Sequence, residues 1–496
     1  MIEQVKHKGL ALLVLAGAQF MVVLDATIVN VALPSIQESL RFTSTAQLQW
    51  IVTAYTLLFG GFLLLGGRLA DLLGRRKIFL FGIVLFAIAS LLAGIAQNPA
   101  QIIAFRGLQG LGAALLSPAA LSLVLNIFQE GKERNKALGV WSGVAAGGGA
   151  VGLLLGGILT QYVDWRWIFF INVPVAAVLI YLAYKNLPAG ESTRKGNSLD
   201  LPGAFLVTAG LMVLVYGLVR ASESGWGGAD TLGLIGAAIA LLVGFVINEM
   251  RVKQPLMPLR IFKNRNVAAG NLMQLPITAG MFSVFFYLSI YMQQVLGYSP
   301  VMTGLANLPF TLFIGTLAAI TSKQIAKVAP KAILIAAPLL TALGLLYFSR
   351  LPVDGNYLTD ILPGIALMAS GMGATFVALT LAATSGVAAK ESGLVSGLLN
   401  TSQQIGGAIG LAVLTTVSTA VTNNALAKAG AGAQNPAILN AALVDGFHTA
   451  FAIAAGLAVA ASLIAFVGLK NSKLSKNDLK HEVEHEAESF PVVPGV

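Results

Sequence analysis

Two charged side chains lie inside stretches that are otherwise apolar, and their chemistry is the first clue to function. Asp25 interrupts the apolar run from Leu10 to Pro34, and Arg106 interrupts another run near 102–126. An ionised side chain at the centre of a bilayer costs about 3 kcal/mol on insertion scales. Such groups mark ion and proton pathways in membrane proteins. We therefore expect Asp25 to face a water-filled cavity, where it exchanges a proton or pairs with a cationic substrate.

A purely structural role for both residues stays open. Asp25 could be held in a fixed polar network, and Arg106 could extend its guanidinium group outward to water. Arg106 and Gln109 are three residues apart and share one helix face. One acid and one base in different helices indicate partners, or two ends of a proton path. The acids Asp200 and Glu249 fall at predicted helix ends, where we expect water to reach them.

The composition is that of a membrane protein. The 496 residues are 56% hydrophobic and 10% charged, with a mean hydropathy of +0.80, whereas soluble chains carry about 25% charged residues. The absence of cysteine excludes disulfides and cysteine-bound metals. The net charge of +10 would fit a nucleic-acid binder, but the distribution of Lys and Arg explains it as membrane topology, and we expect no nucleic acid.

Apolar runs that can cross a bilayer, which takes about 20 residues, must position these side chains. Fourteen such runs follow one another, and their short connections make neighbouring helices antiparallel. The runs lie near 10–33, 47–67, 78–97, 102–126, 138–161, 167–185, 201–220, 232–248, 267–295, 301–322, 332–349, 359–384, 396–421 and 446–469. The sequence therefore predicts an all-α polytopic membrane protein.

The basic residues of the loops predict the orientation. Lys and Arg concentrate in alternate loops, such as the one that holds Arg68, Arg75, Arg76 and Lys77, and are scarce in the others. Loops rich in Lys and Arg stay in the cytoplasm. We therefore expect both termini to be cytoplasmic in a multi-pass protein of the inner membrane. The longest outside loop is expected at about 422–445, with a short amphipathic helix or hairpin.

A weak internal repeat predicts two similar halves. "LGGRLADLLGRRKI" (65–78) resembles "ITSKQIAKVAPKAI" (320–333), although Ala326 stands where the first copy has Asp71. Duplicated halves around a midplane site are typical of transporters. We expect an N-terminal six-helix bundle (1–190), cytoplasmic linkers with two inserted helices (191–263), a C-terminal six-helix bundle (264–470) and a flexible charged cytoplasmic tail (471–496).

Asp71 is a candidate gate residue. It lies in "GRLADLLGRRK" at a cytoplasmic helix end, where it can pair with Arg75 or Arg76 or accept hydrogen bonds from a neighbouring helix N-terminus. The alternative is a solvated loop charge. The repeat favours a gate, because the same loop recurs between the corresponding helices of the second half.

Three glycines recur at a spacing that is typical of close helix packing. Gly148, Gly152 and Gly156 recur every four residues, which allows close helix packing and a smooth sliding face.

"HEVEH" (481–485) matches a zinc-protease pattern but lies in the charged tail without a third ligand, so we expect no metal site. "GLQGLG" (107–112) follows no strand and is no dinucleotide loop, and no Walker A motif occurs. We expect no enzyme activity.

Several stretches together resemble the major facilitator superfamily. They are "LDATIVNVALP" (24–34), "GGRLADLLGRRK" (66–77), "RGLQGLGAA" (106–114) and "WRWIFFINVP" (165–174). "YMQQVLGYSPVMTGLANLP" (291–309) and "SGLLNTSQQIGGAIGLAVL" (396–414) resemble the second half of its fourteen-helix drug:proton antiporter branch. The resemblance runs from about Gly9 to Leu469. It implies two six-helix bundles with two extra inserted helices.

The resemblance also implies roles for individual residues. Asp25 matches a helix-one acid that handles protons or cations, and Arg106 matches a helix-four arginine linked to proton coupling. The gating loop that stabilises one end state is matched by Gly67, Arg68, Asp71, Gly74, Arg75 and Arg76. The glycines of the helix-five antiporter motif are matched by Gly148, Gly152 and Gly156. That motif usually contains a Gly-Pro pair, which this chain replaces with Gly148 and Gly149.

The sequence thus predicts a proton-coupled exporter of hydrophobic or cationic drugs that works by alternating access. Second-half acids used for dications in some members are missing, so monocationic, neutral or amphipathic substrates are expected. The protein should need no cofactor beyond a proton gradient and act as a monomer in the lipid bilayer. Whether a periplasmic adaptor is needed stays open. The expected cavity lining is Asp25, Tyr55, Gln109, Asn271, Gln274, Phe282, Tyr287, Tyr291, Asn307, Asn400 and Gln403.

Two other functions remain alternatives. The same scaffold could export lipids, fatty acids or a siderophore-type metabolite. A membrane receptor or scaffold without transport is the more remote alternative, because it would need neither a mid-span acid nor a duplicated gate.

Overall fold

The computed structural model describes residues 7–129, 132–188, 200–325, 328–384, 387, 389–430, 432 and 435–470, and within these ranges the chain forms helices and connections but no strand. The helices are α1 (Lys8–Leu40), α2 (Thr45–Leu48), α3 (Trp50–Leu73), α4 (Arg75–Gly94), α5 (Pro99–Ile127), α6 (Lys132–Tyr162), α7 (Trp167–Phe170), α8 (Asn172–Asn186), α9 (Leu201–Ser224), α10 (Ala229–Arg251), η1 (Leu259–Lys263), α11 (Arg265–Ile290), η2 (Tyr291–Val295), α12 (Pro300–Gln324), α13 (Pro330–Phe348), η3 (Tyr357–Ile361), α14 (Leu362–Thr384), α15 (Ala389–Ala429) and α16 (Pro436–Gly468).

Most of these helices have the length and composition of membrane spans. Within the described ranges, thirteen segments are long and apolar enough to cross a bilayer. A further helix, α6, has 31 residues and packs along α1. The expected all-α polytopic architecture is therefore confirmed.

The boundaries between spans follow from local side chains. Asn98 and Ser299 each precede a helix that begins with proline, and each side-chain oxygen accepts a hydrogen bond from a backbone N–H in the first turn. Such caps satisfy donors that a helix start leaves unpaired. Gly74 separates α3 from α4 with a φ of 103°, a conformation that residues with a Cβ rarely adopt. The chain thus reverses direction within one residue.

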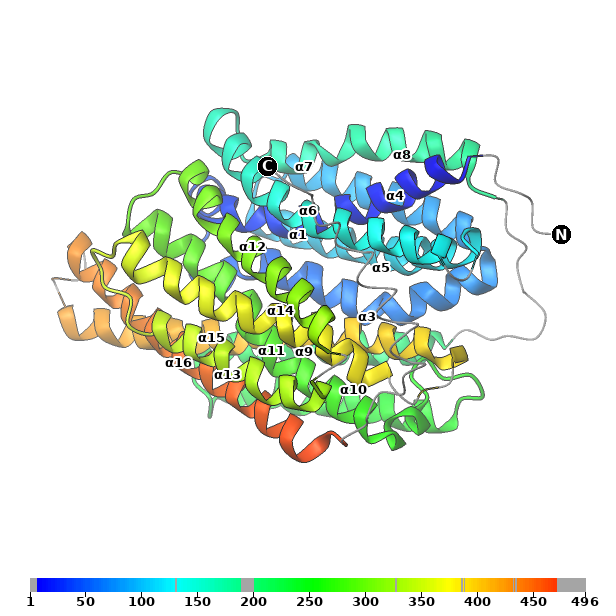
Figure 1. The fold of residues 1–496 in the computed structure, drawn as a ribbon. Helices are drawn as coiled ribbons and strands as arrows, with labels where there is room; N and C mark the ends of the chain where they lie inside the picture. The colour runs from blue at the N-terminus through cyan, green and yellow to red at the C-terminus, as the bar shows by residue number, and fades with distance from the viewer. Residues whose placement is uncertain are drawn as a thin grey trace.

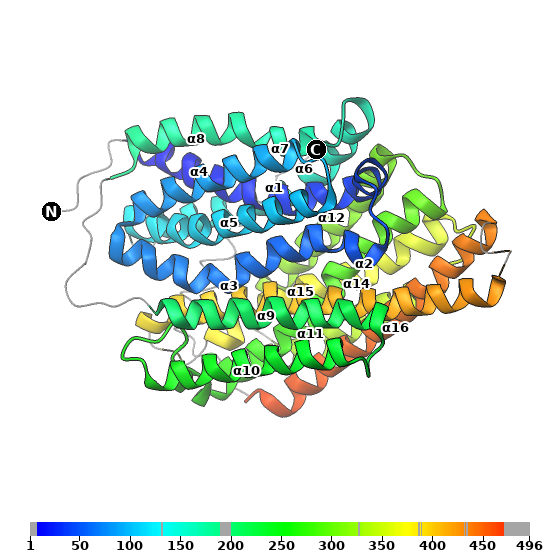
Figure 2. The same ribbon diagram turned by 180° about the vertical axis from the view of Figure 1, so that it is seen from behind.

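The helices form two halves that lie side by side (Figures 1 and 2). The N-terminal half contains α1 to α8, and the C-terminal half contains α11 to α16. The inserted helices α9 and α10 pack on each other along one flank, and α9 also contacts α3 and α15. Because α9 contacts both halves, the insertion bridges them instead of standing apart.

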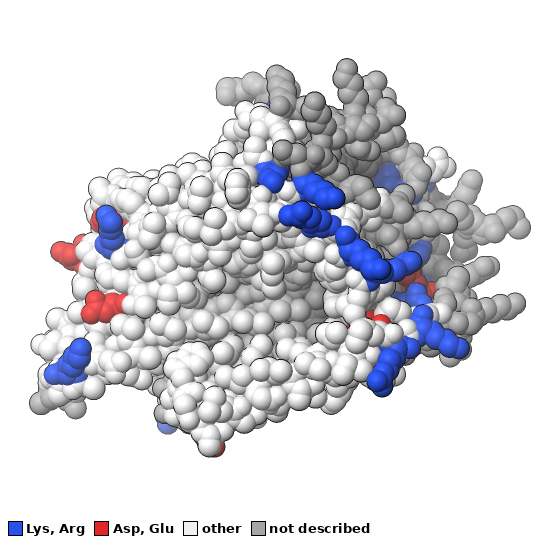
Figure 3. Space-filling view, turned by 90° about the horizontal axis from the view of Figure 1, so that it is seen from below, with Lys and Arg blue, Asp and Glu red and all other residues white. Residues whose placement is uncertain are grey.

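The two ends of the bundle differ in charge. We call the end where α1 and α4 begin the basic end, because Lys and Arg side chains gather there (Figure 3). Its members include Arg68, Arg75, Arg76, Lys331 and Lys470. The opposite end, where α1 and α11 finish, is the distal end. Loops on this side are poorer in basic residues.

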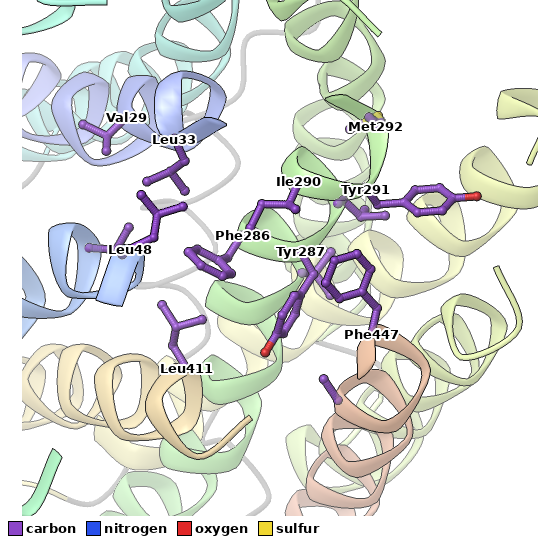
Figure 4. Close-up of a cluster of buried hydrophobic side chains, with 14 of the residues drawn as sticks. Val29, Leu33, Leu48, Phe286, Tyr287, Ile290, Tyr291, Met292, Leu411 and Phe447 are labelled. Carbon is purple, nitrogen blue, oxygen red and sulfur yellow. The ribbon is translucent and has the colours of Figure 1, made fainter. Parts of the chain in front are cut away.

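The halves share one apolar core at the distal end. That cluster combines Leu33 and Leu48 of the N-terminal half with Phe286, Ile290 and Leu411 of the C-terminal half (Figure 4). Polar contacts support the same junction, because the Gln293 side-chain amide donates to the Val31 carbonyl at 2.8 Å, and Gln294 donates to Gln37 at 2.9 Å.

Toward the basic end the two halves have separate cores. One cluster contains only residues of α1 to α8, and another contains only residues of the C-terminal half. Contacts between α3 and α15, and between α6 and α12, still join the flanks. The two halves are therefore held together most extensively at the distal end.

One expectation about the loops is wrong. The long distal loop expected at 422–445 is mostly helix, because α15 continues to Ala429 and α16 begins at Pro436. The residues on both sides are rich in alanine, which favours helix, and Gly430, with a φ of 53°, ends α15. The tail from 471 to 496, including the "HEVEH" stretch, lies outside the described residues.

Candidate functional site

The structure brings Asp25 of α1 and Arg106 of α5 into direct contact. Arg106 Nη1 lies 2.5 Å from Asp25 Oδ2, and Gln109 Nε2 donates to Asp25 Oδ1 at 2.7 Å. Arg106 Nη1 also donates to Gln109 Oε1 at 2.8 Å. The three side chains, at most 1% exposed, form a closed ring in the N-terminal half. Arg106 therefore does not extend outward to water.

The guanidinium group of Arg106 is held on its other sides by α3 and α7. Its Nε donates to the Ile51 carbonyl at 3.2 Å, and its Cζ lies 4.3 Å from the centre of the Tyr55 ring and 5.8 Å from that of Phe169. A cation over an aromatic face gains roughly 2 kcal/mol when both are desolvated. These contacts stabilise the positive charge in a place that water does not reach.

Two residues of this network were missed by the sequence analysis. Asn172, at the start of α8, donates through Nδ2 to Asp25 Oδ1 at 3.0 Å and contacts Ser90 Oγ of α4 at the same distance. Ser90 Oγ in turn donates to the Phe169 carbonyl at 2.8 Å. Polar residues inside the predicted spans 78–97 and 167–185 were the available signal. Nothing in their spacing indicated that both lie beside Asp25.

The network explains how a carboxylate is accommodated inside the bundle. Asp25 is 0% exposed in this structure, so it does not face the water-filled cavity that was expected for it. Asp25 receives hydrogen bonds from Arg106, Gln109 and Asn172, so its negative charge is paired and solvated by protein donors. A buried charge is stable only when it is paired and hydrogen-bonded in this way. Chemically, a proton on Asp25 would break the ion pair and leave Arg106 with an uncompensated charge.

The expected gating loop lies between α3 and α4 at the basic end. Arg75 Nη2 contacts Asp71 Oδ1 at 3.1 Å in a half-exposed pair. Arg76 packs on the Tyr184 ring at 5.2 Å and donates to the Tyr184 carbonyl of α8. Arg68 donates to Gln254 in the connection after α10. The loop is therefore tied both to its own half and to the inserted helices.

The glycines of α6 allow it to lie directly against α1. A Cβ added at Gly152 would come within 2.1 Å of Thr27 Oγ1 and 2.8 Å of the Leu24 carbonyl. One at Gly156 would lie 2.7 Å from the Ile28 carbonyl, and one at Gly148 would lie 3.1 Å from the Phe20 carbonyl. The neighbouring Gly157 faces the other half, where Pro300 begins α12. Through its glycines, helix α6 thus packs on α1 of its own half and on α12 of the other half.

The residues expected to line a central cavity do not share one environment. Tyr55 and Gln109 are buried with Asp25 in the N-terminal half. Tyr287 and Tyr291 lie in the shared distal core (Figure 4). The remaining expected residues fall into three groups: Asn271, Gln274 and Asn307 are buried, Phe282 and Gln403 are partly exposed, and Asn400 is exposed.

A pocket of about 570 Å³ lies between the halves at the distal surface. Glu38 and Arg41 line one side, and Gln293, Gln294 and Tyr298 line the other. It is separate from the Asp25 network, because Asp25 lies more than two helical turns before Pro34, the first residue of α1 that lines the pocket. Within the described residues, no group of three or more His, Asp or Glu side chains could hold a metal ion.

Comparison with known proteins identifies relatives along almost the whole chain. The family model of the Major Facilitator Superfamily matches residues 15–411. The puromycin resistance protein pur8 of Streptomyces alboniger is 41% identical over 487 residues, which cover 97% of this chain and 94% of that protein. The cephamycin export protein CmcT of Amycolatopsis lactamdurans is 41% identical over 421 residues, 84% of this chain and 86% of that protein.

Solved structures support the same fold. A bacterial homologue of the human lysosomal transporter Spinster, in an inward-facing and occupied conformation, has a TM-score of 0.67 at 16% identity and covers 93% of this chain and 97% of its own. A D-xylose-proton symporter has a TM-score of 0.64 at 13% identity, with 94% of this chain and 99% of its own covered.

Proposed function

Because the chain belongs to the major facilitator superfamily, we propose that it is a proton-coupled exporter of antibiotic-like drugs. The relatives named for puromycin resistance and cephamycin export support the substrate class, since both names refer to antibiotics. The observation that carries the mechanism is the buried ion pair between Asp25 and Arg106, because one proton can neutralise Asp25 and so break the pair.

In the proposed topology the protein lies in the inner membrane, and its basic end faces the cytoplasm. Basic loops are retained on that side, and α6 counts as a fourteenth span beside the thirteen apolar ones. Both termini are then cytoplasmic. The division into six helices, two inserted helices and six helices, with boundaries near residues 190 and 264, belongs to the same proposal. The more extensive contacts between the halves at the distal end support an inward-facing state for this structure.

The proposed cycle turns on Asp25. In the outward-facing state a proton from outside neutralises Asp25, and Arg106 loses its partner. The halves then rock about the contacts that join them, between α6 and α12 and between α3 and α15, where glycines allow close packing. Deprotonation toward the cytoplasm restores the ring of Asp25, Arg106 and Gln109. The contacts of the Asp71 loop, which are formed in this structure, rearrange as the cytoplasmic side closes.

Substrate binding is proposed between the halves, in a space that opens as they separate. Phe282, Gln403 and Asn400 are the expected lining residues that retain exposure here. Aromatic and amide groups suit a broad, mostly apolar pocket with a few polar anchors. The transporter acts as a monomer, and its function requires neither a cofactor nor an adaptor protein.

Reconstitution of the full chain in liposomes tests this function. Wild type should export puromycin and a monocationic dye when an inward proton gradient is imposed. Asp25→Asn should still bind both compounds but should no longer respond to the gradient. Asp230→Asn, which changes an exposed acid at the distal end, is the matched control and should transport like wild type. Equal responses of wild type and Asp25→Asn would rule out Asp25 as the coupling site.

A further inference from the structure

A second pair of acids is buried far from the Asp25 network, at the basic end of the inserted helices. Asp200 precedes α9 and is 2% exposed, and Glu249, near the end of α10, is 4% exposed. The expectation that water reaches these helix ends is therefore wrong. The connection after α10 folds back over them, because the Met257 N–H donates to Glu249 Oε2 at 2.7 Å.

Asp200 has the environment of an ionised carboxylate. Its Oδ1 accepts a hydrogen bond from the Gly203 N–H at 2.8 Å, in the first turn of α9. Asn248 Nδ2 lies 2.8 Å from both of its carboxylate oxygens. A helix N-terminus also favours negative charge. Three contacts from donors thus stabilise the charge of Asp200.

Glu249 has the opposite environment. Its Oε1 is buried, and none of the described residues donates a hydrogen bond to it. A Cβ added at Gly203 would lie 2.9 Å from Glu249 Oε1 and 2.3 Å from Asp200 Oδ2, so the two oxygens lie beside each other across this glycine. Two ionised carboxylates held against the same glycine repel each other, whereas one proton between them supplies the missing donor.

Among the residues that the structure describes, few other charges lie near the pair. Arg68 of α3 reaches the connection after α10 through Gln254. Arg251 ends α10 and Lys253 lies in the connection after it, but both are exposed, so water screens them. Within the described part of the chain, Asp200 is therefore the charged group that the geometry places beside Glu249.

We propose that Asp200 and Glu249 share one proton and form a second protonation site, separate from Asp25. In this site Glu249 carries the proton and donates through Oε1 to Asp200 Oδ2. The ligand is a proton taken from the cytoplasmic side, because the pair lies at the basic end.

The site is coupled to the gating loop through the segment 252–258. Glu249 anchors this segment at Met257, and Leu256 packs against Leu65 of α3 and Ala204 of α9. Gln254 of the same segment binds Arg68. Loss of the shared proton leaves two negative charges buried under the segment. That cost exceeds the stronger bond from the Met257 N–H to ionised Glu249, so the segment opens away from α3 and lets water reach the carboxylates. Cytoplasmic pH thereby controls how firmly the inserted helices hold the gate.

Infrared spectroscopy of the full-length protein tests the shared proton. Wild type at neutral pH should show the C=O band of a buried carboxylic acid, which Glu249→Gln should remove and Asp25→Asn should leave. Asp200→Asn should also remove it, because the new amide can donate to ionised Glu249. Persistence of the band in Glu249→Gln, or its absence in wild type, would overturn the proposal. The glutamine in Glu249→Gln can donate to Asp200, so the variant should fold.

Thiol labelling tests the coupling, since the natural chain has no cysteine. Leu256→Cys reports release of the segment, and Lys253→Cys, at an exposed neighbour, is the control for the pH dependence of the reaction. The labelling ratio of the two should rise by roughly threefold or more between about pH 6 and about pH 9 as the segment opens. In the Glu249→Gln background the ratio should stay low at every pH.

A ratio that is constant in wild type, or that rises equally in Glu249→Gln, would contradict the coupling. A cation could occupy the pair in place of a proton, and a sodium arm distinguishes the two. Replacing sodium with choline at constant pH should leave both the infrared band and the labelling ratio unchanged. A change on removing sodium would overturn the proton assignment.

Discussion

The two halves of the molecule bury different kinds of polar groups. The N-terminal half encloses Asp25 and Arg106, with Gln109, Asn172 and Ser90 around them. Among the described residues of 264–470, no Asp, Glu, Lys or Arg side chain is buried, and the buried polar groups are hydroxyls and amides. The halves resemble each other in helix arrangement but not in the charge that their cores hold.

The hydrogen bonds follow the same division. In the N-terminal half those around the buried charges run between helices, as from Asn172 of α8 to Asp25 of α1. Many in the C-terminal half stay within one helix, as from Asn307 to the Thr303 carbonyl one turn earlier. Some bonds there do join helices: Tyr287 bonds Thr415 Oγ1 at 3.2 Å, Ser402 donates to Asn271 at 2.9 Å, and Ser462 donates to the Ile335 carbonyl at 2.6 Å. A change of protonation can therefore rearrange the N-terminal half, whereas the C-terminal half offers an apolar surface to move against.

The largest expected effect comes from breaking the buried pair. Arg106→Leu should lower the free energy of unfolding by about 3 to 5 kcal/mol, because it leaves Asp25 buried without its counter-charge. Unfolding in detergent, followed by tryptophan fluorescence, measures this loss. The double variant Asp25→Asn with Arg106→Gln should recover most of the stability but not the coupling to protons.

The control lies in the other half. Arg350→Leu removes an exposed arginine after α13, and its effect should stay within about 0.5 kcal/mol. If both single substitutions destabilise equally, the contrast between the halves does not rest on the buried charge.

A smaller difference in the free energy of unfolding is expected between two asparagine substitutions. Asn172→Leu removes a donor to a buried carboxylate and should lower the free energy of unfolding by about 1 to 3 kcal/mol. Asn307→Leu removes a bond within one helix and should change it by about 1 kcal/mol or less. The pH dependence of transport should shift in Asn172→Leu but not in Asn307→Leu, because only Asn172 contacts Asp25. An unchanged pH profile in Asn172→Leu would show that Asn172 serves packing alone.

The smallest effect is expected at the polar contact inside the C-terminal core. Tyr287→Phe removes the hydrogen bond to Thr415 but keeps the ring against Phe447 and Phe451, so the loss should be about 1 kcal/mol. Thr415→Val should add little to it, since both substitutions break the same bond. A loss as large as that of Arg106→Leu would mean that neutral contacts support this half as strongly as charge supports the other.

The helices were predictable because apolar runs of spanning length dominate the sequence. The ends were less predictable: alanine-rich segments extend α15 and α16 through the expected loop, and the segment 252–258 covers Asp200 and Glu249. The site was predictable in part. Asp25 and Arg106 stood out as ions within apolar runs, but a sequence does not specify the rotation and depth at which helices meet. Asn172 and Ser90 therefore had no visible connection to Asp25, and the direct ion pair could not be derived.

The buried pair has an electrical consequence. While Asp25 and Arg106 are both ionised, their charges cancel, so moving them across the membrane field does no net work. Once a proton occupies Asp25, the site carries one positive charge, and each charge that crosses the field gains or loses about 2.3 kcal/mol per 100 mV. With one proton per cycle, export of a neutral compound moves net charge and draws on the membrane voltage. Export of a monocation returns the same charge and depends on the pH difference alone.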